Sequence, residues 1–149
     1  PDLAAVTMED GATLDLSSFS ASIGNIKSIA SGVTGDKTVR ISAEGERTFD
    51  NGQTTNLLTN LEFITSSEFN GSGWSADRVG HVLNVGDGSQ AASIKVAQDL
   101  RLESKLTLNI ASGSSAVVGG ELILGHKQTG NPGLVNVNGG TRTVGPIRP

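Results

Sequence analysis

The chain has 149 residues, enough for one domain with a buried core, and it contains no cysteine, which excludes disulfide frameworks and thiolate metal sites. The formal net charge is −4, and Lys and Arg are scattered along the chain, which argues against nucleic-acid binding. No run approaches the roughly 18 apolar residues of a membrane-spanning helix, so membrane insertion is not expected. Aromatic residues make up only 3% and glycine occurs 20 times, which suits a narrow core of small aliphatic layers.

The first third of the chain predicts short strands separated by turns. Strands are expected over 11–16 and 37–42, because apolar and polar residues alternate in both. Residues 44–47 are expected to turn, and Asp50-Asn51-Gly52 is a strong turn signal. Segment 1–53 is therefore expected to supply the first coils of a sheet-based fold.

The middle segment, 54–80, is the least regular part of the pattern. One set of its apolar residues has helical spacing: Leu57, Leu58, Leu61 and Ile64. Residues 61–65 also fit a strand, and strands are favoured because every neighbouring segment has that pattern. The segment ends in a Gly/Ser loop with the only Trp of the chain, Trp74, and such a loop often folds over an open core edge.

Segment 81–149 is predicted to form repeated coils. Short strands are expected over 82–85, 93–96, 100–102, 106–110, 116–118, 121–124 and 134–137. Leu83-Asn84-Val85-Gly86 resembles Leu122-Ile123-Leu124-Gly125, and Ser93-Ile94-Lys95-Val96 is matched with Leu134-Val135-Asn136-Val137. The offset from Gly86 to Gly125 is 39 residues, which fits one large coil or two of roughly 20 residues.

Strands this short are not stable alone, but they become stable when successive coils stack. We therefore predict an all-β fold, a right-handed parallel β-helix with short strands and an irregular loop segment near the middle. Inward aliphatic ladders are expected at Leu83/Val85, Ile94/Val96, Leu100/Leu102, Leu106/Leu108/Ile110 and Leu122/Leu124. Four side chains are expected to face solvent: Lys95, Arg101, Asn109 and Asn136.

Two stretches resemble known repeats. Residues 12–26, ATLDLSSFSASIGNI, resemble the autotransporter-associated β-strand repeat, with its ATLDL strand, its small polar turn with an aromatic residue, and its IG pair. Residues 83–141 resemble the related Gly/Ser-rich repeats of bacterial surface β-solenoids, in which L-x-V-G-D-G and V-x-V-N-G-G-T alternate. The resemblance covers roughly half of the chain. It implies a solenoid that is secreted or exposed on a bacterial cell surface, often as a stalk or adhesin, and it brings no set of functional residues.

Trp74 is the candidate group for binding a sugar, because an exposed ring stacks on the apolar face of a pyranose. Phe69 and Arg78 lie close to it in sequence and complete the candidate site. The competing interpretation is a Trp that covers the core.

Asp87, in the turn Gly86-Asp87-Gly88, is a candidate Ca²⁺ ligand, as Gly-Asp turns are in calcium-binding β-rolls. The corresponding residue of the second copy is His126, and an imidazole is a poor ligand for a hard cation, so a turn without metal is favoured. No other cofactor is expected. His81 and His126 are both expected to lie in exposed turns.

Catalysis is not expected. Three carboxylate pairs have spacings that glycosidase chemistry would need to bring together: Asp10/Asp15, Glu44/Glu46 and Glu62/Glu68. A chain with 15 acidic residues yields such pairs by chance. There is also no phosphate-binding glycine motif and no G-x-S-x-G elbow.

These patterns lead us to expect a non-catalytic, extracellular structural or adhesive module. An uncapped solenoid exposes unpaired strand edges, so end-to-end self-association is expected, with other surface proteins or an extracellular polysaccharide as further partners. One alternative is a carbohydrate-binding module attached to a glycan-degrading enzyme, and another is a fragment of a β-helix lyase or hydrolase. The chain begins at Pro1 without a leader sequence, so a fragment of a larger protein is expected.

Overall fold

The computed structural model describes residues 7–15, 33–41, 46–48, 54–70, 81–103, 106–125 and 134–148. Every regular element in these ranges is a β-strand. The strands are β1 (Thr13–Asp15), β2 (Thr38–Ile41), β3 (Glu46–Thr48), β4 (Thr54–Leu57), β5 (Asn60–Phe63), β6 (Ser67–Asn70), β7 (Val82–Val85), β8 (Ser93–Val96), β9 (Leu100–Glu103), β10 (Thr107–Ala111), β11 (Ser115–Val118), β12 (Leu122–Leu124), β13 (Leu134–Asn138), β14 (Thr141–Val144) and β15 (Ile147–Arg148).

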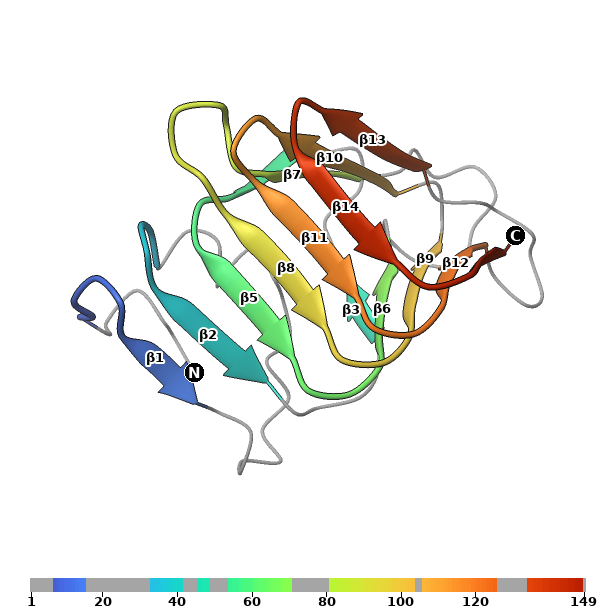
Figure 1. Cartoon of the computed structure of the whole chain (residues 1–149), viewed down its shortest axis with the longest axis horizontal. Coiled ribbons are helices and arrows are strands. Elements are labelled where there is room, and N and C mark those ends of the chain that lie inside the picture. Colours follow the sequence, from blue (N-terminus) through green and yellow to red (C-terminus); the bar gives the residue numbers. More distant parts are fainter. Residues whose placement is uncertain are drawn as a thin grey trace.

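The strands form three parallel sheets around a common interior (Figure 1). Sheet 1 has six strands in the order β1-β2-β5-β8-β11-β14, sheet 2 has four in the order β13-β10-β7-β4, and sheet 3 has five in the order β15-β12-β9-β6-β3. Each complete coil contributes one strand to each sheet, so β7 leads to β8 and β9 before the chain returns to β10 beside β7. The coils wind in a right-handed sense from the N-terminal to the C-terminal end in Figure 1, as parallel crossover connections do. The predicted parallel β-helix is confirmed.

The strands between residues 54 and 70 are regular. The helical interpretation of this segment is wrong, because it forms β4, β5 and β6. The irregular segment predicted for 54–80 therefore does not begin at residue 54, and residues 71–80 lie outside the described ranges. The turn expected at 44–47 is also partly wrong, because β3 begins at Glu46 and pairs with β6.

The 39-residue offset is not the length of a coil. Leu83 lies in sheet 2, opposite Leu108, whereas Leu122 lies in sheet 3, opposite Leu100. The two similar stretches thus occupy different walls of the solenoid. The second match also fails, because β8 belongs to sheet 1 and β13 to sheet 2.

Equivalent positions instead recur at shorter and unequal intervals. Along sheet 2, the row Asn56, Asn84, Asn109 and Asn136 has successive separations of 28, 25 and 27 residues. The strands keep a parallel register because the variation in length is taken up at the corners, where backbone and side-chain positions are less constrained.

The interior consists of aliphatic rows, one residue per coil. In sheet 1, a single row contains Val39, Leu61, Ile94 and Ala116, which are at most 3% exposed. Each fully buried Leu or Ile side chain contributes roughly 1.5–3 kcal/mol relative to its exposed state, so these rows supply much of the stability. The predicted ladders are confirmed, except that Leu124 is only partly buried.

Candidate functional site

The aromatic site predicted around Trp74 is not assembled by the described residues. Trp74 and Arg78 lie in 71–80, outside the described ranges. Phe69 lies in β6 and its side chain is 0% exposed. Its ring meets Phe63 edge to face, with centroids 5.7 Å apart and an interplanar angle of 60°. Assigning Phe69 to a sugar-stacking site was therefore wrong, because the ring fills the core and is not accessible to a ligand.

His81 is buried, and the expectation of an exposed turn histidine was wrong. Its side chain is 0% exposed, and its Nε2 atom lies 2.7 Å from the hydroxyl of Thr55, which is also buried. The pair joins the residue that precedes β7 to β4 in the previous coil. His81 is thus a hydrogen-bonded core residue, and His126 lies outside the described ranges.

Asp87 is exposed and stabilises the turn between β7 and β8. Its Oδ1 atom accepts hydrogen bonds from the backbone N–H groups of Ser89 (2.8 Å) and Gln90 (2.6 Å). These bonds, that of Gln90 first, hold the pKa of Asp87 below its usual value because they favour the ionised carboxylate. Gly86 and Gly125 follow strands of different sheets, so the two glycines are not equivalent, and His126 lies outside the described ranges.

Gly86 makes this turn possible for two reasons. Its φ of +76° lies in the left-handed region, where residues with a side chain are strained. A Cβ atom at this position would also collide with the Oγ atom of Ser114 in the next coil. The turn can therefore approach its neighbour closely only with glycine at position 86.

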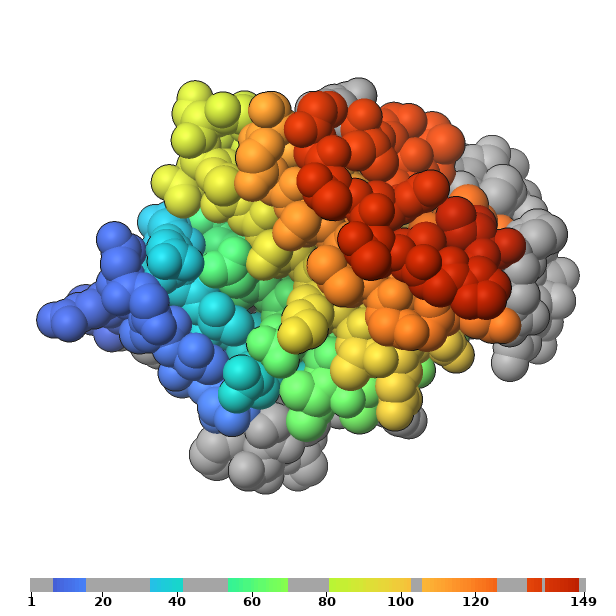
Figure 2. Space-filling view, in the orientation of Figure 1, coloured from blue at the N-terminus to red at the C-terminus, as the bar shows by residue number. Residues whose placement is uncertain are grey.

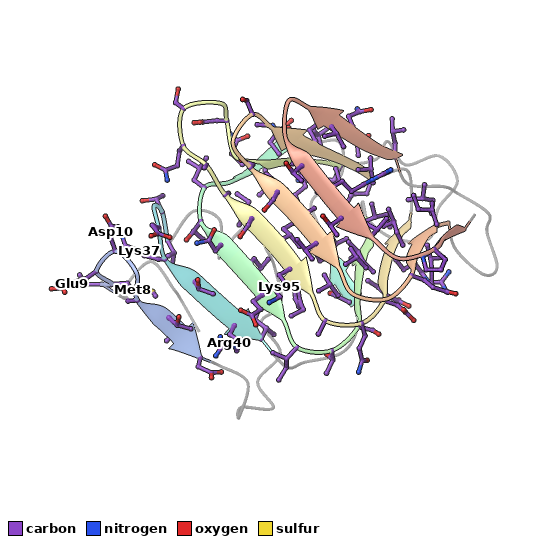
Figure 3. All side chains as sticks on the ribbon, viewed as in Figure 1. Met8, Glu9, Asp10, Lys37, Arg40 and Lys95 are labelled. Carbon is purple, nitrogen blue, oxygen red and sulfur yellow. The ribbon has the colours of Figure 1, made fainter. Side chains whose placement is uncertain are left out.

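The outer face of sheet 1 carries a column of alternating charges. Asp15, Arg40, Glu62 and Lys95 occupy one register row in successive strands, and Figure 3 shows Arg40 and Lys95 on this face. Arg40 lies 3.4 Å from Asp15 and 3.4 Å from Glu62. The hydrogen bond and charge of Glu62, and then those of Asp15, raise the pKa of Arg40. The column ends at the uncharged Val117.

Of the three carboxylate pairs, the structure places Glu62 and Glu68 on different sheets. Asp15 is paired with Arg40, Glu62 is on sheet 1, and Glu68 is on sheet 3 beside Arg101, at 3.5 Å. Glu44 lies outside the described ranges.

Arg101 projects outward as predicted, but it is largely covered, with its side chain only 11% exposed. It donates a hydrogen bond of 2.8 Å to the carbonyl of Gly125. Its role in the structure is to tie neighbouring coils of sheet 3 together.

Sheet 2 carries a feature that the sequence interpretation missed, an asparagine ladder formed by Asn56, Asn84, Asn109 and Asn136. The side-chain amides of Asn84, Asn109 and Asn136 each donate a hydrogen bond to the amide oxygen of the asparagine in the preceding coil, at 2.9, 2.9 and 3.0 Å. Asn109 and Asn136 were expected only to face solvent. The recurrence of Asn at the third position of each strand, in TTNL, VLNV, TLNI and LVNV, was a signal that could have revealed the ladder.

A groove of about 440 Å³ lies over the centre of this ladder. Its lining comes from β7, β10 and the turns that follow them: Asn84, Gly86, Asp87, Gly88, Asn109, Ala111 and Ser112. In Figure 2 the turn after β7, coloured yellow-green, forms part of the projection at the upper left. In this groove the side-chain amides of Asn84 and Asn109 lie beside the carboxylate of Asp87 and the hydroxyl of Ser112.

A smaller groove, of about 120 Å³, lies on sheet 3 beside Arg101 and Asp99.

Within the described ranges, no group of three or more His, Asp or Glu side chains is placed to hold a metal ion. The same ranges contain no helix long and apolar enough to cross a membrane. Comparisons of the chain with protein-family models, with curated proteins and with solved structures found no match.

Proposed function

We propose that this protein is a non-catalytic structural or adhesive module that self-associates head to tail into a longer solenoid. The observation that carries the proposal is that, in the described part of the chain, sheet 1 ends at both sides in a strand with a single neighbour, and the described charges near the two ends are opposite. Among the described strands, β1 and β14 each have one neighbour in the sheet. Edge strands offer unpaired backbone groups to another strand.

The direction of the strands suits head-to-tail contact. Every strand pair of sheet 1 is parallel. A second copy displaced along the coil axis therefore presents its β1 to β14 in the same parallel orientation. Such a contact joins two different surfaces, so it repeats and builds a filament rather than a closed dimer.

The N-terminal end is acidic. Glu9 and Asp10 lie in the exposed turn before β1, at the end of the molecule marked by the labels in Figure 3. Asp36 is exposed in the turn before β2, and Lys37 is the cation beside it. The described residues of this corner thus carry three carboxylates and one ammonium group.

The C-terminal end is apolar and basic. Arg142 of β14 is exposed although its register position, opposite Ala116, points to the core in the preceding coil. Like charges would oppose contact between two identical C-terminal ends, whereas Arg142 suits the acidic N-terminal corner. The last coil also exposes Leu134 (53%), Val137 (42%) and Ile147 (47%), which a stacked copy would cover.

The secreted or cell-surface location belongs to the same proposal and is supported by the resemblance of 12–26 and 83–141 to bacterial surface repeats. The alternative is a carbohydrate-binding module built on an aromatic site. It is less well supported, because Phe69 is buried in the core and cannot contact a sugar.

Sedimentation velocity over a wide range of protein concentration and ionic strength tests the assembly. We expect concentration-dependent oligomers that dissociate as salt screens the charged contact.

The Arg142→Glu variant should remain monomeric, and so should Glu9→Lys/Asp10→Lys. Combining the three substitutions reverses both charges and should restore assembly. Lys95→Glu, the same kind of charge reversal on the middle of sheet 1, is the matched control and should assemble like the parent. A parent protein that stays monomeric at every concentration and salt would refute the proposal.

A further inference from the structure

The asparagine ladder retains hydrogen-bonding capacity where it forms the floor of the groove on sheet 2. A side-chain amide has two N–H donors and an oxygen with two lone pairs. Asn84 and Asn109 each use one N–H and one lone pair within the ladder. Each therefore has one donor and one acceptor left, and both residues line the groove.

The ladder bonds also fix these groups in place. Each amide is held by a neighbour on either side, so its plane is set before any ligand arrives, and little conformational entropy is lost on binding. Neighbouring strands are about 4.8 Å apart, so the two donor–acceptor pairs recur at that spacing across the groove. This distance is similar to the length of one pyranose ring.

The wall of the groove is equally rigid. The Asp87 carboxylate is tied to the backbone N–H groups of Ser89 and Gln90, and the turn can pack against Ser114 only because position 86 is glycine. The remaining lining residues, Gly88, Ala111 and Ser112, are small and leave the floor accessible. A volume of about 440 Å³ lies within the range of roughly 300–1,000 Å³ that is typical of small-molecule sites.

The chemistry of the lining selects among ligand classes. It contains no Lys, Arg or His, and its single charged group is the Asp87 carboxylate, so phosphates and acidic ligands are disfavoured. One carboxylate with neutral amides is a weak donor set for a divalent cation. A donor and an acceptor side by side on one amide match two adjacent hydroxyl groups. We propose that this groove binds a neutral polysaccharide chain, which lies across β7 and β10 along the ladder.

The binding test uses the full-length chain with the Arg142→Glu substitution, so that self-association does not interfere. Neutral glucan, mannan and xylan oligosaccharides are titrated in the presence of EDTA, and oligogalacturonate serves as the anionic comparison. The readout is the set of side-chain amide signals of Asn84 and Asn109 in ¹H–¹⁵N NMR spectra. At least one neutral oligosaccharide should shift these signals saturably, while oligogalacturonate should not.

Ser112→Leu fills the groove without changing the ladder and should weaken binding by about tenfold or more. Ser89→Leu, on the same turn as Asp87 but outside the groove lining, is the matched control and should bind like the parent. No shift with any of the three neutral oligosaccharides would overturn the proposal, and so would binding of oligogalacturonate alone or equal binding by Ser112→Leu. Because the monomeric variant is used, these outcomes are independent of whether the solenoids assemble.

Discussion

Thr55 and His81 form a buried polar pair between two coils, with Thr55 Oγ1 2.7 Å from His81 Nε2. The bond joins positions 26 residues apart in sequence. A buried polar group that loses its partner costs free energy, so this pair fixes how the two coils meet.

Replacing Thr55 with Val should therefore lower the free energy of unfolding by about 1–3 kcal/mol, because the shape is kept while the hydrogen bond to His81 is lost. Thr55→Ser retains the hydroxyl and should cost less. Urea unfolding followed by circular dichroism measures both. Equal losses for the two variants would show that the hydroxyl contributes nothing.

The asparagine ladder predicts a dependence on position. Asn84→Ala removes two ladder bonds, whereas Asn136→Ala, at the end of the ladder, removes one. With each bond contributing about 0.5–1.5 kcal/mol, the loss for Asn84→Ala should be roughly twice that for Asn136→Ala. Chemical unfolding of the Arg142→Glu background, which keeps both variants monomeric, gives the comparison. If the two losses are equal, the amides do not act as a ladder.

The two glycines beside Asp87 form a matched pair for testing the turn. Both have positive φ, 76° at Gly86 and 90° at Gly88, but only Gly86 lacks space for a Cβ atom. Gly88→Ala should show the backbone strain alone, about 1 kcal/mol or more, and Gly86→Ala should show that strain and the collision with Ser114. A lower melting temperature for Gly88→Ala than for Gly86→Ala would contradict this geometry.

Phe69 provides a test of its assignment to the core. Phe69→Ala should destabilise the protein by about 3–5 kcal/mol, and Phe69→Leu should recover part of the loss by refilling the space beside Phe63. Thermal unfolding measures both. A Phe69→Ala protein that is as stable as the parent but fails to bind saccharide would instead make Phe69 a binding residue.

Asp87 predicts a specific effect of pH. Its pKa in the folded protein lies below its ordinary value of 3.8, so folding stabilises the ionised form. The contribution is present above pH 3.8 and is lost as the pH falls through the lowered pKa of the folded state. Compared with Asp87→Asn, the parent should be more stable at neutral pH, and the difference should shrink in acid. A difference that is constant with pH would show that the carboxylate charge is not involved.

The walls of the solenoid could be predicted because alternation reports directly on which side chains point inward. Ile94 and Val96 flank Lys95, and both are buried while Lys95 is exposed. The same local rule favoured a strand over 61–65, where β5 lies, but it did not place β4 or β6. The helical spacing of Leu57, Leu58, Leu61 and Ile64 arises from two strands joined by a short turn.

The pairing between coils could not be predicted in the same way, because it depends on the length of every corner. The similar sequences that end in Gly86 and Gly125 suggest that the two segments are equivalent positions of successive repeats. In the structure the two glycines follow strands of different sheets. His81 illustrates a second limit. A histidine just before a strand can point inward or outward, and the hydroxyl of Thr55 in the previous coil favours the inward orientation.

The unequal coils also bear on how this chain can change. Asn60 and Ser93 are neighbours across 33 residues, whereas Ala92 and Ser114 are neighbours across 22, and the strands stay in register in both cases. The longer circuit includes residues 71–80, between β6 and β7. Since doubling the length of a loop costs only about 0.6 kcal/mol, connections between strands of such a solenoid can be lengthened with little effect on the walls. The connections between the walls are therefore the positions where evolution or protein engineering can introduce new binding specificities while the three sheets stay unchanged.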